Sequence, residues 1–260
     1  MLDIEWGGIA LLVLYFAITV TAPRILNSPH LISRYPRFHI FIWLDALVTA
    51  LFTLTVGSGL LIADGLTGYG STTRSDEWLS SVTQTLLAWA AVAFLGIIIF
   101  RLGAGVSAIQ GEQREGQRAL SKFLETSASG IVAGRPVNIV DEPSIVVTAI
   151  PHTNDIIVST GFVNSVPERL QRAALSHEQS HISNRHHALL AAAHLAMVAA
   201  AGIPASRKFA QAMRISTELA ADDDAARTHG ASTVADALDA CFGDSADVNE
   251  RSRRLRERSP

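Results

Sequence analysis

The sequence is poor in cysteine and carries no excess of positive charge. Cys241 is the only cysteine among 260 residues, so no disulfide can form within the chain. A lone thiol suits a reducing compartment. The formal net charge is −3, from 21 basic and 24 acidic side chains, so no global positive field indicates a nucleic-acid partner. These shortages argue against a disulfide-stapled secreted scaffold and against a nucleic-acid-binding protein.

Hydrophobic sequence is abundant, and it is concentrated in the first 103 residues. Three runs, at residues 7–21, 38–63 and 82–102, reach or approach the length of about 20 residues that a membrane-spanning helix needs. The N-terminus is acidic and lacks the basic segment of a secretory signal, so we expect the first run to remain as an uncleaved helix. Residues 1–103 are therefore predicted to form a three-helix transmembrane region.

Basic residues in the loops predict the orientation of these helices. The first loop carries Arg24, Arg34 and Arg37 without any acid, whereas the second carries Arg74 beside acidic residues. Basic residues return after residue 102. We therefore expect a multi-pass protein of the cell (inner or plasma) membrane. Its N-terminus would lie outside, and the first loop and everything after residue 102 would lie in the cytoplasm.

The second half contains an HExxH motif, in which His177 and His181 flank Glu178. Four residues make about one helical turn, so both imidazoles lie on one face of a helix and can bind one metal ion. Glu178 lies beside them, where it can take a proton from a water molecule. Ser165 and Glu168 predict a capping box at the start of this helix, which we expect to run to residue 186 or 187.

Residues 104–243 are predicted to form a mainly helical α+β domain with a small sheet around this motif. Strand signals lie at 136–140, 145–150 and 155–159, with a hairpin turn at 151–154. A further helix is expected at 206–229, ending at Gly230. Residues 244–260 hold five arginines and few apolar residues, and are predicted to be a disordered polar tail.

A catalytic zinc ion takes three protein ligands and a water molecule, and the motif supplies two of them. Glu218 is the strongest candidate for the third, because the small residues around it let its helix approach the metal closely. Asp222, one turn further on, can accept a hydrogen bond from the far nitrogen of a ligand histidine. Asp223 and Asp224 are expected to be solvated. A single membrane crossing at 188–203 would put Glu218 on the opposite side from His177 and His181. The apolar run there is therefore predicted to be a core helix of a helical hairpin or a helix partly sunk in the bilayer.

The HExxH motif, followed about 37 residues later by Glu-Leu-Ala-Ala-Asp, resembles the gluzincin membrane peptidases. The BlaR/MecR antirepressor branch is the more similar and the HtpX/CAAX-prenyl group the next, because three spans precede a cytoplasmic catalytic domain. The resemblance covers about residues 100–240 and implies a zinc metalloendopeptidase with one Zn²⁺ per chain. It implies His177, His181 and Glu218 as ligands, Glu178 as base and Asp222 behind the ligands. The sensor members of that branch add a fourth span and an extracellular penicillin-binding domain. Neither is found among these residues, so β-lactam sensing is not expected.

We expect a protein or peptide substrate, hydrolysed in regulatory proteolysis on the cytoplasmic side of the lipid bilayer. Metalloproteases often bind substrate as an added strand, and residues 145–149 precede the active-site helix. The predicted substrate contacts there are Val146, Val147, Thr148 and Ala149. An oxyanion donor is also expected, and His152, His186 and His187 stay open as candidates.

Other interpretations remain open. The chain could be a latent or non-catalytic scaffold within a larger membrane complex, although a scaffold does not need Glu178. A structural zinc site would want a fourth protein ligand, for which Cys241 alone is poorly suited. An intramembrane peptidase would share every catalytic residue and differ only in receiving its substrate from the bilayer. A signal-transducing role, with the signal arriving through the spans or a partner, is the last alternative.

Overall fold

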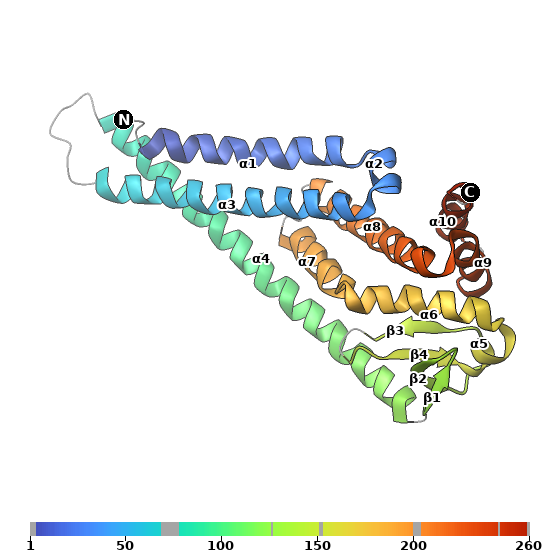
Figure 1. Cartoon of the computed structure of the whole chain (residues 1–260). Helices are drawn as coiled ribbons and strands as arrows, with labels where there is room; N and C mark the ends of the chain where they lie inside the picture. Colours follow the sequence, from blue (N-terminus) through green and yellow to red (C-terminus); the bar gives the residue numbers. More distant parts are fainter. Residues whose placement is uncertain are drawn as a thin grey trace. The chain divides into compact units, whose positions relative to one another are not determined.

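The computed structural model describes residues 4–68, 78–125, 127–150, 153–199, 204–243 and 245–258 (Figure 1). The chain divides into two compact units, and the helices α2, α3, α4, α7 and α8 contribute residues to both. The first unit comprises residues 1–32, 38–107 and 193–212, and the second comprises residues 33–37, 108–192 and 213–260.

Three long apolar helices dominate the first unit. They are α1 (Ile4–Leu26), α3 (Pro36–Gly68) and α4 (Trp78–Glu125), and the short α2 (Pro29–Arg34) joins the first two. Each contains a stretch long and apolar enough to cross a membrane, namely Trp6–Leu26, Pro36–Leu66 and Thr85–Ser107. The three predicted candidate spans are therefore confirmed by length and composition, and they support an association with a membrane.

Small residues let α1 and α3 approach each other closely. A β-carbon added to Gly8 would lie only 3.0 Å from the carbonyl oxygen of Gly57. Such close backbone contacts are typical of helices that pack within a bilayer. Further along, Tyr15 of α1 is buried with Leu54 of α3, and its ring packs edge-on against Phe94 of α4.

A four-stranded mixed sheet forms one layer of the second unit. Its order is β1-β2-β4-β3, with β2 and β4 parallel and the two outer pairs antiparallel. The predicted strands occur as β2 (Arg135–Val140), β3 (Val147–Ala149) and β4 (Ile156–Ser159). The prediction missed β1 (Ala128–Val132), which pairs with β2 through a tight turn at Ala133 and Gly134, both at positive φ. Residues 151 and 152 of the expected hairpin turn lie outside the described residues.

Helices cover one face of this sheet. The core between them contains Val158, Phe162, Leu175, Leu238 and Leu255, each at most 1% exposed. The helices that follow β4 along the chain are α5 (Thr160–Ser165), α6 (Glu168–Ser183), α7 (His186–Ala199), α8 (Pro204–His229), α9 (Ala231–Cys241) and α10 (Ala246–Glu257), of which α6 packs on β3 and β4 and α5 contacts β4.

The start and end of the motif helix differ from the prediction. The capping box does not form, because Ser165 ends α5 and Pro167 occupies the cap position of α6 without a side-chain hydrogen bond. Gln171 instead fixes the turn by donating to backbone carbonyls, including that of Val166. The helix ends at Ser183 rather than at residue 186 or 187, because Arg185 adopts a positive φ of 51° and interrupts it.

The prediction of a disordered tail at 244–260 is wrong, since most of it forms α10. Ser245 caps this helix by accepting a hydrogen bond from the backbone N–H of Val248. Leu255 is buried in the core, and Arg251 and Arg254 pair with acidic residues of α8. Arg251 and Arg254, two of the arginines that suggested disorder, are therefore neutralised by partners about 30 residues earlier in the chain.

Candidate metal centre

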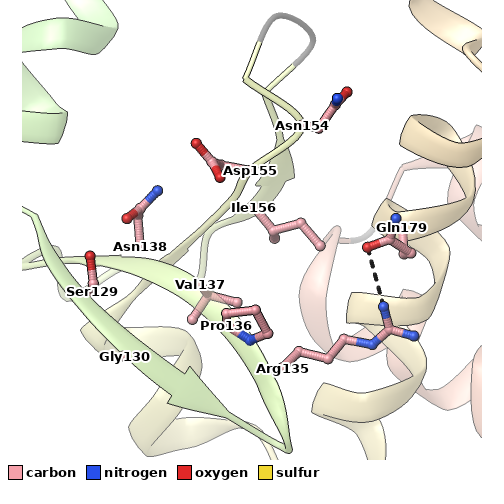
Figure 2. Close-up of a pocket in the computed structure, with 10 residues that line it drawn as sticks. All are labelled: Ser129, Gly130, Arg135, Pro136, Val137, Asn138, Asn154, Asp155, Ile156 and Gln179. Atoms are coloured by element: carbon pink, nitrogen blue, oxygen red, sulfur yellow. Dashed lines mark hydrogen bonds between the residues drawn. The ribbon is translucent and has the colours of Figure 1, made fainter.

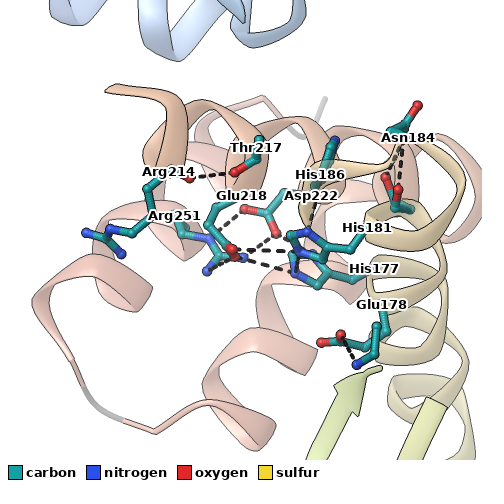
Figure 3. A network of polar contacts seen from close by, with 12 residues as sticks. His177, Glu178, His181, Asn184, His186, Arg214, Thr217, Glu218, Asp222 and Arg251 are labelled. Carbon is teal, nitrogen blue, oxygen red and sulfur yellow. Dashed lines mark hydrogen bonds and ion pairs between the residues drawn. The ribbon is translucent and has the colours of Figure 1, made fainter. Parts of the chain in front are cut away.

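The two histidines of the HExxH motif face the same point from α6 (Figure 3). His177 and His181 are one turn apart and are 3% and 8% exposed. Their Nε2 atoms lie 3.1 Å apart. Such a short separation between two ring nitrogens suits either a shared proton or a shared ion.

Glu218 of α8 completes a group of three donors that could hold a metal ion. Its Oε2 lies 3.6 Å from Nε2 of His177, and its Oε1 lies 3.7 Å from Nε2 of His181. A tetrahedral zinc site with ligand distances of about 2.1 Å has ligand–ligand edges of about 3.4 Å. The separations are close to that value, with Glu218 facing the two histidines through different oxygens, so the three residues could hold a tetrahedral ion with one corner left for water.

Asp222 lies behind this group, on the next turn of α8. It is completely buried, and its Oδ1 is 3.0 Å from Nδ1 of His177. A carboxylate in this position holds the ligand histidine in the tautomer that leaves Nε2 available to an ion. Arg251 of α10 donates to both oxygens of Asp222, from Nε at 2.8 Å and from Nη2 at 2.7 Å.

These charges shift one another's proton affinities. Burial alone would lower the pKa of His177, but its hydrogen bonds to Asp222 and Glu218 raise it above the usual value. Burial would raise the pKa of Asp222 and Glu218, but Arg251 and His177 hold both well below the ordinary range. Burial and the neighbouring His177 lower the pKa of His181 to about 3.

Glu178 points toward the sheet rather than toward the carboxylates of α8 (Figure 3). Its Oε2 accepts a hydrogen bond of 2.8 Å from the backbone N–H of Ala149, on the edge strand β3. Burial raises its pKa, although the positive His177 and the Ala149 N–H oppose the shift. A buried carboxylate with a raised pKa, beside a metal-binding group, has the proton affinity that general acid–base chemistry needs.

The second ligand histidine also has a partner for its far nitrogen. Nδ1 of His181 lies 3.0 Å from Nδ1 of His186, which is 2% exposed at the start of α7. Burial lowers the pKa of His186 to about 4, so this imidazole is neutral and can accept the proton on His181. The sequence suggests His186 only as a candidate oxyanion donor, and His152, a candidate for the same role, lies outside the described residues.

Asp223 and Asp224 are not solvated, in contrast to the prediction. Asp223 pairs with Arg254 at 2.9 Å. Asp224 pairs with Arg37, and it accepts hydrogen bonds from Ser180 of the motif helix at 2.7 Å and from Asn184 at 2.9 Å. These roles could not be predicted from the sequence, because the partners lie on α3, α6 and α10, far from Asp223 and Asp224 along the chain.

A separate pocket of about 270 Å³ lies between the strands and the outer side of α6 (Figure 2). Gln179, the central residue of the motif, lines it and accepts a hydrogen bond from Arg135. Asp155 and Asn138 line the opposite side. None of the described lining residues belongs to the three-donor group, and Gln179 lies two positions from each histidine, which places it on the opposite side of α6.

Arg251 is the residue of the centre that the sequence reasoning missed. It lies in the arginine-rich segment that was predicted to be disordered. The apolar residues Val248 and Leu255 are seven positions apart and both buried, a helical spacing that could have indicated α10. The high density of charged residues around Val248 and Leu255 indicates a solvated, disordered segment instead.

Comparisons with protein-family models, with curated proteins and with solved structures found no match to this chain. The features of the chain that bear on its function are the three-donor group and the candidate membrane helices.

Proposed function

We propose that this protein is a membrane-bound zinc-dependent endopeptidase that acts on protein or peptide substrates on the cytoplasmic side of the cell membrane. The observation that carries the proposal is the convergence of His177, His181 and Glu218 within 4.8 Å, with Glu178 beside them. Two imidazoles, one carboxylate and an open fourth position are the donor set of catalytic zinc sites such as that of thermolysin. When bound there, zinc supplies Lewis acidity and lowers the pKa of a coordinated water to about 7.

Glu178 is the general base in this proposal. One of its oxygens is held by the Ala149 N–H, which fixes the carboxylate and leaves the other oxygen to receive a proton. Its raised pKa lets it accept the proton of the attacking water and return it to the leaving amine nitrogen. The residue thus acts first as base and then as acid within one turnover.

The edge strand β3 supplies the backbone for substrate binding. Backbone hydrogen bonds flank the β3–β4 pair at Val146 and Ile150, so in the alternating antiparallel pattern the backbone groups of Val147 and Ala149 point away from β4. Their carbonyl groups can accept N–H groups from an extended peptide, which would then lie beside Glu178. Main-chain pairing of this kind recognises an unfolded segment rather than one particular side chain.

Two arguments together support a cytoplasmic position for the loop between α1 and α3 and for the centre. The first is the excess of arginine in that loop. The second is direct contact within the second unit, because Arg254 donates to the carbonyl of Ser33 at 2.7 Å and Arg37 pairs with Asp224. The positive-inside rule makes that side the cytoplasm.

The test begins with the full chain purified in detergent, with zinc measured per chain. Wild type, Glu178→Gln and Glu168→Gln are then incubated with membrane and cytosolic protein extracts, and new N-termini are identified by chemical labelling and mass spectrometry. Glu168 is a matched control, because it lies on the same helix, is exposed, and pairs only with Arg172 among the described residues.

We expect about one zinc per chain in all three proteins, and new termini with wild type and Glu168→Gln only. Zinc without any difference between the three would favour the latent or scaffold interpretation. Absence of zinc binding after reconstitution would exclude the metal centre itself. Substrates that are all membrane-embedded segments would place cleavage within the bilayer instead of the cytoplasm.

A further inference from the structure

The C-terminal helix contributes a cation to the metal centre. Arg251 of α10 is 7% exposed, and its guanidinium lies among the carboxylates of α8 (Figure 3). Nε and Nη2 bind the two oxygens of Asp222, and Nη1 lies 3.0 Å from Oε2 of Glu218. All three nitrogens of one side chain are thus engaged by the metal ligand and by the carboxylate behind it.

We propose that Arg251 is a positioning residue that restricts Glu218 to single-oxygen coordination of the ion and fixes Asp222 against His177. The proposal rests on the metal centre of the proposed function and adds to it the control of how one ligand binds. With Oε2 held by Arg251, the other oxygen, Oε1, is the one that remains for the ion.

Glu218 needs such a restraint because packing alone does not fix it. Its side chain is 26% exposed, whereas those of His177 and Asp222 are 3% and 0% exposed. A glutamate with this freedom can turn both oxygens toward a cation, and a second bound oxygen would occupy the corner needed for water. The planar guanidinium presents its donors in a fixed fork, which lysine cannot reproduce.

The helix that carries Arg251 is itself anchored. Ser252 donates to Asp239 of α9 at 2.6 Å, and Leu255 is 1% exposed. One turn after Arg251, Arg254 makes an equivalent buried contact with Asp223, but it touches no described residue of the three-donor group. Arg254 is therefore a matched control for the structural part of any effect.

The experiment uses the full chain in detergent, with Co²⁺ as the probe in place of zinc. The visible absorption of bound Co²⁺ weakens as its coordination number rises, so it reports how many ligand atoms are present. Competition with a chromophoric chelator gives the affinity of the same site. Wild type, Arg251→Gln, Arg251→Lys and Arg254→Gln are compared, and circular dichroism records whether each is folded.

We expect Arg251→Gln to bind Co²⁺ about 10- to 100-fold more weakly, as is typical when the partner of a metal ligand is lost. Its visible bands should be weaker and shifted. Arg251→Lys, which keeps the charge, should recover part of the affinity but not the spectrum. Arg254→Gln should keep both the affinity and the spectrum of wild type.

Equal affinities and spectra in wild type and both Arg251 variants would overturn the positioning role while leaving the metal centre intact. The same shift in Arg254→Gln would also overturn it, because the effect would then come from a loosened α10. If Arg251→Gln does not fold, Arg251→Lys decides alone. Failure of wild type to bind Co²⁺ or zinc would instead refute the proposed function.

Discussion

The two buried carboxylates of the centre should respond oppositely to the same chemical change. Asp222 and Glu178 are 0% and 7% exposed. Asp222 binds a buried guanidinium and stays ionised, because Arg251 and His177 hold its pKa low against the effect of burial. Among the described residues, Glu178 accepts a hydrogen bond from the backbone N–H of Ala149, and burial raises its pKa. Replacing each with its amide in metal-free buffer should therefore separate them.

The expected magnitude for Asp222→Asn follows from the partner left behind. Breaking a buried ion pair by neutralising one member costs about 3–5 kcal/mol. The asparagine oxygen still accepts from Arg251, so we expect the lower end, about 3 kcal/mol, which is about a 150-fold change in an equilibrium constant. Glu178→Gln removes a charge that burial disfavours, so stability should be unchanged or higher at neutral pH.

Cys241 provides the assay. It is the only cysteine, it is buried in the core of the second unit, and burial raises the pKa of its thiol to about 12. Its reaction with a fluorogenic maleimide therefore requires opening of the structure, and at constant pH the labelling rate follows the opening equilibrium. Labelling of Asp222→Asn should be about 150-fold faster than that of wild type.

Glu178→Gln should label at the wild-type rate or more slowly. If it labels as fast as Asp222→Asn, the assignment of different electrostatic roles to the two carboxylates is incorrect. If Asp222→Asn labels at the wild-type rate, the pair with Arg251 contributes nothing to stability, and the reasoning from burial fails.

Three further predictions concern pH, metal and packing. Hydrogen bonds from Ser180 and other donors hold the pKa of Asp224 low although burial would raise it. The stability that they contribute is present above the unfolded pKa of about 3.9 and is lost as the pH falls through the folded value. Urea unfolding followed by circular dichroism should therefore show a smaller loss of stability at acid pH for Asp224→Asn than for wild type. Zinc at about 1,000 times its dissociation constant should stabilise wild type by about 4 kcal/mol, and thermal unfolding of Glu218→Ala should show almost none of this increment. Gly161→Ala should cost about 3 kcal/mol or more in chemical unfolding, because its β-carbon would lie 2.2 Å from the carbonyl oxygen of Pro143; a wild-type midpoint would mean that this loop moves freely.

The candidate spans and the long helices could be predicted because their signals are local. Hydropathy over about 20 residues is a property of the segment itself, and three such segments were found. The HExxH spacing fixes the relation of His177 and His181 once the segment is helical. The helix predicted at 206–229 occurs as Pro204–His229, with Gly230 at its end in the positive-φ conformation that glycine favours.

The remaining features depend on partners that are distant in sequence. The arginines of α10 read as a solvated, disordered run until Asp222 and Asp223 are known to face them. Arg185 interrupts the motif helix through its backbone conformation, although no glycine or proline marks the site. The role of His186 likewise requires knowing that α7 turns back so that its first residue meets His181. The sequence shows which residues are charged, but it does not show which of them lie close enough in space to pair.

A guanidinium beside a cation site has an electrostatic cost, and the charges of the centre show why it is tolerated. With both ligand histidines neutral, the ionised Glu178, Glu218 and Asp222 outweigh Arg251 by two negative charges, which is the charge that a divalent ion neutralises. Protons compensate the same excess, and the carboxylates raise the pKa of His177 even though its burial alone would lower it. Metal binding must therefore displace protons, and affinity should fall as the pH falls. Without Arg251 the buried excess would be three charges, so the arginine matches the centre to a divalent ion.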